Sequence, residues 1–525
     1  MPKVLITDEL SPRAVAVFAE RGIDAVMRIG LPADQLAACI GEYDGLAVRS
    51  ATKVTQALIE AGGALKVIGR AGIGVDNIDV PAATQRGIVV MNTPYGNAIT
   101  AAEHTIAMMF SLARQIPAAD RSTQAGKWEK SRFMGVELTG KTLGIIGCGN
   151  IGAIVADRAH GLKMRVIGYD PFLSAERAVD LGIERVTLDE LLARADFITL
   201  HTPMTEATRG MIDAKALAKL KPEARIVNCA RGGLIVEADL AEALDRGWLA
   251  GAAIDVFVNE PATENPLFGR DNVVATPHLG AATTEAQENV AVQIAEQMAD
   301  FLLTGAVSNA VNMPSLTAED AARLKPYMQL AEQIGSFAGQ LTDSGIKSVA
   351  IDYEGAIAEL NIKPLTATAL TGLLAPQLAT VNMVNAPVIC RERDIRISET
   401  LRPEPGDYQM LMRITVTSEA GQRAIAGTVF AGDKPRLVAV EGIPLEAELG
   451  RHILFVRNYD KPGFIGALGN ALAAAAVNIA TFHLGRTAAG QDAICLVEVD
   501  QELTPALLDT VRGLPNVIQA KSMKF

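Results

Sequence analysis

Short runs of Val, Ile and Leu alternate with helical patterns through the first 310 residues of the chain. These runs cover residues 3–8, 45–50, 66–72, 142–147, 165–170, 197–201, 225–231, 252–257 and 273–278. Continuous apolar runs of this length are typical of parallel strands that helices cover on both faces. A long helical segment at 99–115 separates two series of strands, and another at 283–303 would return the chain to the first. The pattern therefore predicts α/β architecture with two doubly wound Rossmann-like lobes and a cleft between them.

The pattern changes after residue 315. Residues 316–450 begin helical and then become β-rich, with alternating positions as at 408–418 and 424–432. From residue 451 the order is strand, helix, two strands, helix and strand, which predicts a ferredoxin-like βαββαβ module. We therefore expect an α+β intervening domain followed by this small terminal module. The expected domains are 1–97 together with 284–308, then 98–283, 309–450 and 451–525.

Composition narrows the class of protein. The 525 residues carry a net charge of −12, which disfavours nucleic acid or an anionic membrane as the main partner. The five cysteines are scattered without a CxxC, so they predict neither a disulfide framework nor a zinc site. No apolar stretch approaches the length of a membrane span, and the N-terminus lacks a signal-peptide profile. We expect a soluble cytoplasmic protein.

A Gly-rich motif is the clearest chemical signal. Gly147, Gly149 and Gly152 form G-x-G-x-x-G directly after a predicted strand and at the start of a predicted helix. Glycines there permit a tight turn and close approach to a pyrophosphate, whose charge the helix N-terminus favours. Asp170 ends the next strand, where its carboxylate can bind a ribose diol. It would repel the 2′-phosphate of NADP, so the motif predicts NAD.

A second Gly-rich turn, GRAGIGVDNID at 69–79, does not match this fingerprint. It lines the cleft or has a purely structural role. Whichever role Arg70 has, the close backbone at Gly72 and Gly74 would suit an anionic substrate.

Three polar residues follow successive predicted strands: Arg231, Glu260 and His278. In doubly wound sheets this edge is where ligands bind. His278 follows a proline among small residues, which leave room for a ligand. Hydride transfer from an alcohol needs an acid/base for the hydroxyl proton and a cation for a carboxylate or oxyanion. The three residues together predict such a site, although each alone also has an ordinary solvent or turn role.

The motifs GCGNIG, HTPMTEATRG, NCARGG, DVFVNEP and TPHLGAAT resemble those of the D-isomer-specific 2-hydroxyacid dehydrogenases over residues 3–305. The resemblance implies that His278 is the acid/base, that Glu260 pairs with it, and that Arg231 binds the substrate carboxylate. It further implies contacts to NAD from Gly147, Gly149, Asn150, Ile151, Gly152, Asp170, Thr202, Cys229, Arg231, Asp255, His278 and Gly280.

The whole chain is similar to the long-form D-3-phosphoglycerate dehydrogenases of that family, whose terminal module is an ACT domain. This resemblance implies NAD-dependent oxidation of 3-phosphoglycerate to 3-phosphohydroxypyruvate, the first step of serine synthesis. Arg49 and Arg70 would hold the anionic substrate, and Lys130 is either a further phosphate contact or part of a basic surface. A homo-oligomer, dimer or tetramer, is also implied.

The terminal module resembles ACT domains at YDKPGFIGAL and VNIATFHLGR. In such domains the positions of Asn458, Asp460 and Asn478 clasp an amino acid between two modules. We therefore expect L-serine as an effector, although these residues could simply cap turns and a helix.

Two other functions remain open. A glyoxylate or hydroxypyruvate reductase would prefer NADP or gain nothing from a substrate phosphate. A non-enzymatic NAD(H)-sensing regulator would not turn over 3-phosphoglycerate.

Overall fold

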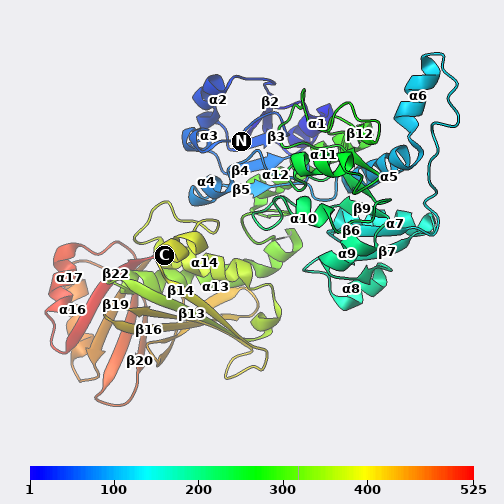
Figure 1. The fold of residues 1–525 in the computed structure, drawn as a ribbon. Helices are drawn as coiled ribbons and strands as arrows, with labels where there is room; N and C mark the ends of the chain where they lie inside the picture. The colour runs from blue at the N-terminus through cyan, green and yellow to red at the C-terminus, as the bar shows by residue number, and fades with distance from the viewer. Residues whose placement is uncertain (317) are drawn as a thin grey trace.

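The computed structural model describes residues 1–316 and 318–525, which form four β-sheets with their covering helices. Figure 1 shows the two N-terminal sheets side by side and the two C-terminal sheets in a separate half of the molecule. The predicted fold class is confirmed. Within the described residues, none of the helices combines the length and apolar character needed to cross a membrane.

The first sheet is parallel throughout, in the order 2-1-3-4-5. Its strands are β1 (Lys3–Ile6), β2 (Asp24–Met27), β3 (Gly45–Val48), β4 (Val67–Arg70) and β5 (Val89–Met91). Its covering helices are α1 (Pro12–Glu20), α2 (Ala33–Cys39), α3 (Gln56–Ala61), α4 (Val80–Gln85) and α12 (Thr284–Thr304). Buried α12 residues such as Ile294 and Met298 share a core with strand residues Val4 and Val67, so the late helix does return to the first lobe.

The second sheet is also parallel, in the order β12-β11-β10-β9-β6-β7-β8. Its strands are β6 (Thr142–Ile146), β7 (Arg165–Tyr169), β8 (Glu184–Arg185), β9 (Phe197–Leu200), β10 (Arg225–Asn228), β11 (Gly251–Ile254) and β12 (Val273–Ala275). Its helices are α5 (Ala98–Arg114), α6 (Ile116–Gln124), α7 (Asn150–Gly161), α8 (Ala175–Asp180), α9 (Leu188–Arg194), α10 (Ala214–Leu217) and α11 (Glu237–Asp245). The strand order reverses between β6 and β9, the point where doubly wound sheets bind nucleotides.

The third sheet is mixed, in the order β14-β13-β15-β16-β17-β18. Its strands are β13 (Ile346–Gly355), β14 (Arg396–Arg402), β15 (Met410–Ser418), β16 (Gly421–Phe430), β17 (Lys434–Val440) and β18 (Ile443–Ala447). Helices α13 (Ala318–Leu341) and α14 (Lys363–Leu374) lie together, with α15 (Ala386–Glu392) beyond them. This is the α+β arrangement expected from the alternating pattern.

The terminal sheet has the ferredoxin-like order β20-β21-β19-β22 and is antiparallel. Its elements are β19 (His452–Tyr459), α16 (Phe464–Ala474), β20 (Ile479–Arg486), β21 (Asp492–Val499), α17 (Pro505–Arg512) and β22 (Val517–Lys524). One face buries Leu454 and Val456 under α16 and α17. The other face carries Phe455 and Leu496 into the core of the third sheet, so the two C-terminal sheets share one core.

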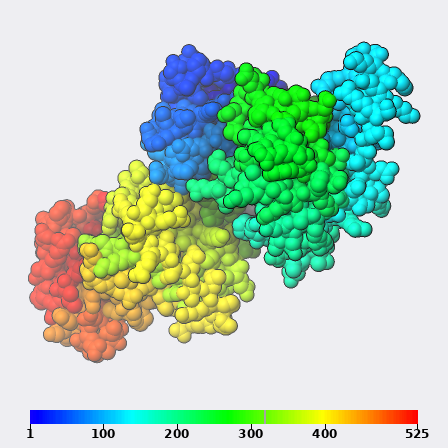
Figure 2. Space-filling view, viewed as in Figure 1, coloured from blue at the N-terminus to red at the C-terminus, as the bar shows by residue number. Residues whose placement is uncertain are grey.

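Helix α13 joins the two C-terminal sheets. Phe337 is fully buried and makes ring contacts at 6.0 Å with both Phe455 and Phe525. The Gln340 side chain donates to the Lys524 carbonyl and accepts from the Lys524 amide, at 2.8 and 3.0 Å. Near its other end, Leu324 packs into the core of the first lobe. Figure 2 shows the resulting molecule, with the C-terminal half resting against the first lobe.

Phe337→Ala should lower the free energy of unfolding of the C-terminal half by about 3–5 kcal/mol, because truncating a buried ring leaves a cavity. Denaturant unfolding followed by circular dichroism measures this change. Phe430→Ala is the matched control, since this ring is 38% exposed and its loss should cost much less. Equal losses of unfolding free energy for the two substitutions would contradict the conclusion that the buried Phe337 ring stabilises the C-terminal half.

Candidate functional site

The Gly-rich turn between β6 and α7 has room for a pyrophosphate. Gly147 has φ +93°, and a Cβ atom there would lie 2.6 Å from the His201 carbonyl oxygen. A Cβ on Gly152 would lie 2.1 Å from the Gly147 carbonyl oxygen, so this position also requires glycine. A Cβ on Gly149 would meet no atom within 4 Å, which leaves open space at the N-terminus of α7, where Asn150 and Ile151 begin the helix. These residues fit a dinucleotide.

Asp170 follows β7 and lies beside this turn. Its two carboxylate oxygens accept hydrogen bonds from the backbone amides of Cys148 (2.9 Å) and Phe172 (2.8 Å). Each oxygen keeps a lone pair for a ribose hydroxyl. On the other side of the turn, Thr202 follows β9, and its amide nitrogen would lie 3.0 Å from a Cβ on Gly147. The structure thus brings Asp170 and Thr202 to the same turn.

The predicted catalytic residues meet at the edge formed by the ends of β10, β11 and β12. His278 Nδ1 and Glu260 Oε2 lie 2.7 Å apart. The other Glu260 oxygen accepts a hydrogen bond from the Phe257 amide at 2.9 Å. Burial favours a higher pKa for Glu260, but the hydrogen bonds from His278 and Phe257 outweigh it and hold this pKa below the usual range. Glu260 is therefore an anion that orients the imidazole.

Asp255, at the end of β11, holds the turn that carries His278. Its Oδ1 accepts from Thr276 Oγ1 at 2.6 Å and from the Leu279 amide at 2.8 Å, while Oδ2 accepts from the Gly280 amide at 2.9 Å. The Asp255 carbonyl oxygen also accepts from the His278 amide at 2.8 Å. His278 has φ +55°, a left-handed conformation that costs energy for a residue other than glycine. The bonds to Asp255 offset that cost.

His104 on α5 completes this arrangement, and the sequence pattern did not single it out. Its Nε2 lies 3.1 Å from Asp255 Oδ1. The ligand atoms of His104, Cys229 and Asp255 lie within 4.8 Å of one another, close enough to hold a metal ion. Burial, then the Asp255 charge, raise the pKa of the Cys229 thiol to about 12, and the Asp255 oxygens already accept several hydrogen bonds. The group is therefore better explained as a hydrogen-bonded support for the His278 turn.

The first lobe contributes arginines to the same cleft. Arg70 ends β4, and its Nε is buried without a hydrogen-bond partner among the described residues. Burial, and then repulsion from Arg231, lower the pKa of Arg70 to about 10. A Cβ on Gly72 would lie 1.6 Å from Arg70 Nη1, so the turn backbone contacts the guanidinium. Arg49 follows the neighbouring strand β3, and its Nη1 donates to the Glu9 carbonyl at 3.3 Å. This lobe therefore offers cations to an anionic ligand.

Arg231 faces these arginines from the second lobe, and its Nε donates to Asp76 Oδ2 at 2.9 Å. Asp76 was not among the residues predicted from the sequence, although its place in the second Gly-rich turn was a usable signal. Lys130 is exposed on the segment after α6, which projects beyond the second lobe (Figure 1). Among the described residues, the Lys130 side chain has no hydrogen-bond or ion-pair partner, so the structure does not link it to Arg49 and Arg70.

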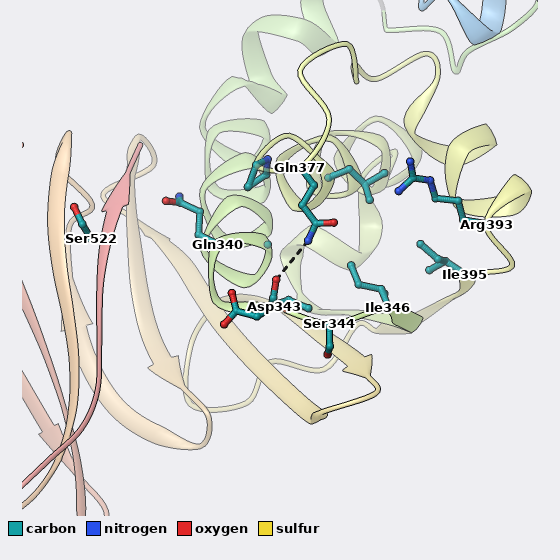
Figure 3. A pocket seen from close by; sticks show the side chains of 13 residues that line it. Gln340, Asp343, Ser344, Ile346, Gln377, Arg393, Ile395 and Ser522 are labelled. Carbon is teal, nitrogen blue, oxygen red and sulfur yellow. Dashed lines mark hydrogen bonds between the residues drawn. The ribbon is translucent and has the colours of Figure 1, made fainter. Parts of the chain in front are cut away.

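A cavity of about 710 Å³ lies elsewhere, between the ends of α13 and α14 and strand β22. Figure 3 shows Gln340, Asp343, Gln377, Arg393 and Ser522 around it. Gln377 Nε2 donates to the Thr342 carbonyl across it at 3.4 Å, and Asp343 is ion-paired with Lys521. None of the predicted catalytic residues lines this cavity. The cleft between the two N-terminal lobes is therefore the candidate active site.

The predicted effector residues do not gather in one chain. Asn458 and Asp460 lie at one end of the terminal sheet, where Asn458 pairs with Ala493 of β21. Asn478 precedes β20 at the opposite end and donates to Asp500 Oδ2 at 2.8 Å. Asp460 Oδ2 accepts from Arg486 Nη1 at 2.7 Å. The Asn458 Oδ1 is buried and has no hydrogen-bond partner among the described residues.

Comparison with known proteins agrees with this architecture. Residues 106–280 match the NAD-binding domain of the D-isomer specific 2-hydroxyacid dehydrogenases, 323–441 match the D-3-phosphoglycerate dehydrogenase intervening domain, and 452–516 match the ACT domain. The D-3-phosphoglycerate dehydrogenase of Synechocystis sp. is 43% identical over 100% of this chain and 95% of its own. The chain belongs to the D-3-phosphoglycerate dehydrogenase family. That of Bacillus subtilis is 40% identical over 99% of both chains.

Two of the similar solved structures cover 59% of this chain. The NAD⁺-bound 3-phosphoglycerate dehydrogenase of Entamoeba histolytica is 32% identical, with a TM-score of 0.51, and covers 59% of this chain and 98% of its own. A glyoxylate reductase from Paecilomyes thermophila is 30% identical, with a TM-score of 0.55 and the same 59% of this chain covered. The family and the cofactor are therefore those expected from the sequence, and NAD is the cofactor of the chain's nucleotide-binding domain.

Asp170→Ala should weaken NAD binding and improve use of NADP, because it removes both the ribose acceptor and the repulsion of a 2′-phosphate. The kcat/KM ratio for the two cofactors measures this change. Asp180→Ala, an exposed acid at the end of α8, is the charge-matched control and should leave the ratio unchanged. A wild type that uses the two cofactors equally would contradict the argument.

Proposed function

We propose that this protein oxidises 3-phospho-D-glycerate to 3-phosphohydroxypyruvate with NAD. The observation that carries the proposal is the His278–Glu260 pair, which lies with Arg231 at one sheet edge. Arg49 and Arg70 contribute cations from the facing lobe, and a substrate with both a carboxylate and a phosphate ester requires such cations. The full-length likeness to D-3-phosphoglycerate dehydrogenases supports this choice of substrate over the glyoxylate reductase alternative.

Each residue has a defined part in the proposed reaction. Glu260 holds Nδ1 of His278 as a donor, which leaves Nε2 free to accept the C2 hydroxyl proton. Bound NAD supplies the acceptor for the C2 hydride. Arg231 stabilises the substrate carboxylate and the carbonyl oxygen that forms. Glu260 then stabilises the imidazolium, while Arg70, with its unpartnered buried Nε, and Arg49 bind the remaining anionic group.

Steady-state kinetics of NADH formation from 3-phosphoglycerate tests the function directly. His278→Gln should lower kcat by roughly 10²–10⁴-fold, the usual contribution of a positioned acid/base. NAD affinity should stay unchanged, because the amide keeps a polar group of similar size. His160→Gln, a histidine on α7 that contacts the Leu181 carbonyl, is the control and should keep normal kcat. Near-normal turnover by His278→Gln would remove this residue from the mechanism.

We also propose that the chain works as a homo-oligomer, a dimer or a tetramer, and that it is cytoplasmic. Large apolar side chains gather on the end of α5 and the projecting segment that follows it. They are Phe110 (37% exposed), Ile116 (50%), Trp128 (85%) and Met134 (76%). An exposed group of this kind is typical of a contact between protein chains.

The domain limits expected from the sequence also stay proposals. Two features support them: the first sheet packs with α12 in one core, and the third and fourth sheets share another. The proposed limits are 1–97 with 284–308 for substrate binding, 98–283 for NAD binding, 309–450 for the intervening domain and 451–525 for the ACT domain.

For regulation, we propose that L-serine binds between ACT domains of two chains and lowers turnover. Asn458 Oδ1 is a buried acceptor without a hydrogen-bond partner among the described residues, and Asp460, now paired with Arg486, could offer its carboxylate to an ammonium group. Asn478 lies at the other end of the same sheet. A two-fold pairing of sheets would place the Asn478 of one chain near the Asp460 of the other, so only an oligomer would complete the site.

Asp460→Ala should abolish serine binding and serine inhibition while basal turnover stays normal. Titration calorimetry measures binding, and NADH formation with and without serine measures inhibition. Asp509→Ala removes a different surface ion pair of the ACT domain, with Arg512, and should keep both properties. Absence of serine binding to the wild type at millimolar concentration would refute the effector assignment and leave the catalytic proposal untouched.

A further inference from the structure

The ion pair between Arg231 and Asp76 spans the cleft between the N-terminal lobes. Asp76 lies in the Gly-rich turn after β4 of the first sheet, and Arg231 follows β10 of the second. The donor and acceptor atoms, Arg231 Nε and Asp76 Oδ2, are 2.9 Å apart. Any movement that opens the lobes must stretch or break this bond. The pair therefore links the geometry of a substrate-binding arginine to the closure of the cleft.

Asp76 is presented on a turn that the first lobe fixes in place. The next residue, Asn77, donates its side-chain amide to the carbonyls of Arg49 and Thr52, both at 2.7 Å. Asn92 donates to the Ile73 carbonyl at 2.5 Å. These bonds tie the turn to the connection after β3 and to β5, so the Asp76 carboxylate projects from a rigid support.

The same turn packs against the guanidinium itself. A Cβ atom on Gly74 would lie 1.7 Å from Arg231 Nη2 and 2.7 Å from Asp76 Oδ2. A Cβ at this position would therefore displace the ends of both side chains that form the ion pair.

Two hydrogen bonds that the Arg231 side chain donates fix its orientation. Nε donates to Asp76, and Nη1 donates to the Ala230 carbonyl at 2.6 Å. A guanidinium has five donor hydrogens in a planar fork. The remaining three are on Nη1 and Nη2, next to the Gly72–Gly74 turn, where they stay available to a ligand. Asp76 thus leaves most of the binding capacity of Arg231 unused.

Asp76 also offsets the crowding of positive charge in the cleft. Arg49 and Arg231 both act to lower the pKa of Arg70, whereas Asp76 acts to raise it. Asp8 is the other acid that acts on Arg70, but its carboxylate already accepts the backbone amides of Arg49 and Thr52. Asp76 is thus the acid that contacts the guanidinium of Arg231 directly.

We propose that Asp76 is a positioning residue for the oxidation of the hydroxyacid: across the cleft, it orients Arg231 toward the substrate carboxylate. This role rests on the proposed dehydrogenase function, in which Arg231 binds that carboxylate. Asp76 does not touch the reacting atoms. It acts by holding the free edge of the guanidinium beside the Gly-rich turn.

The test compares Asp76→Asn, Asp76→Ala and Asp76→Glu in the full chain. Asp76→Asn should raise KM for 3-phosphoglycerate by about 10–100-fold, since a hydrogen bond to a charged group is being weakened. Asp76→Ala should raise it at least as much, and Asp76→Glu should restore part of the loss because it returns the charge. The Kd for NAD, measured by fluorescence titration, should stay within about twofold, because the Gly147 turn is unaffected.

Asp300→Asn is the matched control. It removes one charge from another ion pair of the first lobe, Arg21–Asp300 at 2.6 Å, outside the cleft. The changes in KM and in unfolding temperature of Asp300→Asn show how much the loss of one charge alone alters these two quantities. The positioning role is refuted if Asp76→Asn leaves the KM for 3-phosphoglycerate unchanged. It is also refuted if NAD affinity and unfolding temperature fall to the same extent as KM rises.

A fall in KM for Asp76→Asn would also refute the role, because it would mean that Asp76 competes with substrate for Arg231. Failure of the positioning role of Asp76 can be distinguished from failure of the proposed function. If the wild type oxidises another 2-hydroxyacid instead of 3-phosphoglycerate, the same KM comparison applies to that acid, whose carboxylate Arg231 would equally bind. If it oxidises no 2-hydroxyacid at all, both the function and the role are refuted.

Discussion

The buried carboxylate of Asp255 is the constraint on which the candidate site depends. It gathers the side chain of Thr276 and the amides of Leu279 and Gly280, and its own carbonyl accepts the His278 amide. A single residue at the end of β11 thereby shapes the turn after β12. Since hydrogen bonds to a charged group are stronger than neutral ones, an anion there can hold His278 in a conformation that it would otherwise avoid. In this conformation, His278 Nδ1 lies 2.7 Å from Glu260 Oε2.

The two halves of the cleft divide the chemistry between them. The second lobe supplies the nucleotide turn, the His278–Glu260 pair and Arg231, while the first supplies Arg49, Arg70 and the second Gly-rich turn. Neither lobe holds a full set of groups for a charged hydroxyacid. The Arg231–Asp76 bond and helix α12, which packs on the first sheet after the chain leaves the second, connect the two sets. The residues proposed for catalysis are thus joined to the first lobe by a direct contact.

Sequence reasoning found most of the fold because the parallel strands are continuous apolar runs. It also predicted that His278, Glu260 and Arg231 lie at one sheet edge, because each follows a strand of one sheet. It missed β14, whose seven residues are all exposed and therefore show no apolar pattern. It could not pair Asp76 with Arg231 or His104 with Asp255, since each pair is more than 150 residues apart in the chain. The placement of Asn478 opposite Asp460 likewise depends on strand direction, which motifs do not encode.

Burial of the inner ACT face against α13 has a consequence for how this architecture can vary. Two solved relatives match 59% of this chain over 98% of their own length, so they are shorter than this chain. A chain cut between the intervening and ACT domains would instead expose Phe337 and the rest of the shared core to water. Such a shortened chain would be prone to aggregate, because large exposed apolar surfaces associate. We expect the two C-terminal domains to unfold together, as a single cooperative unit, because they share one core.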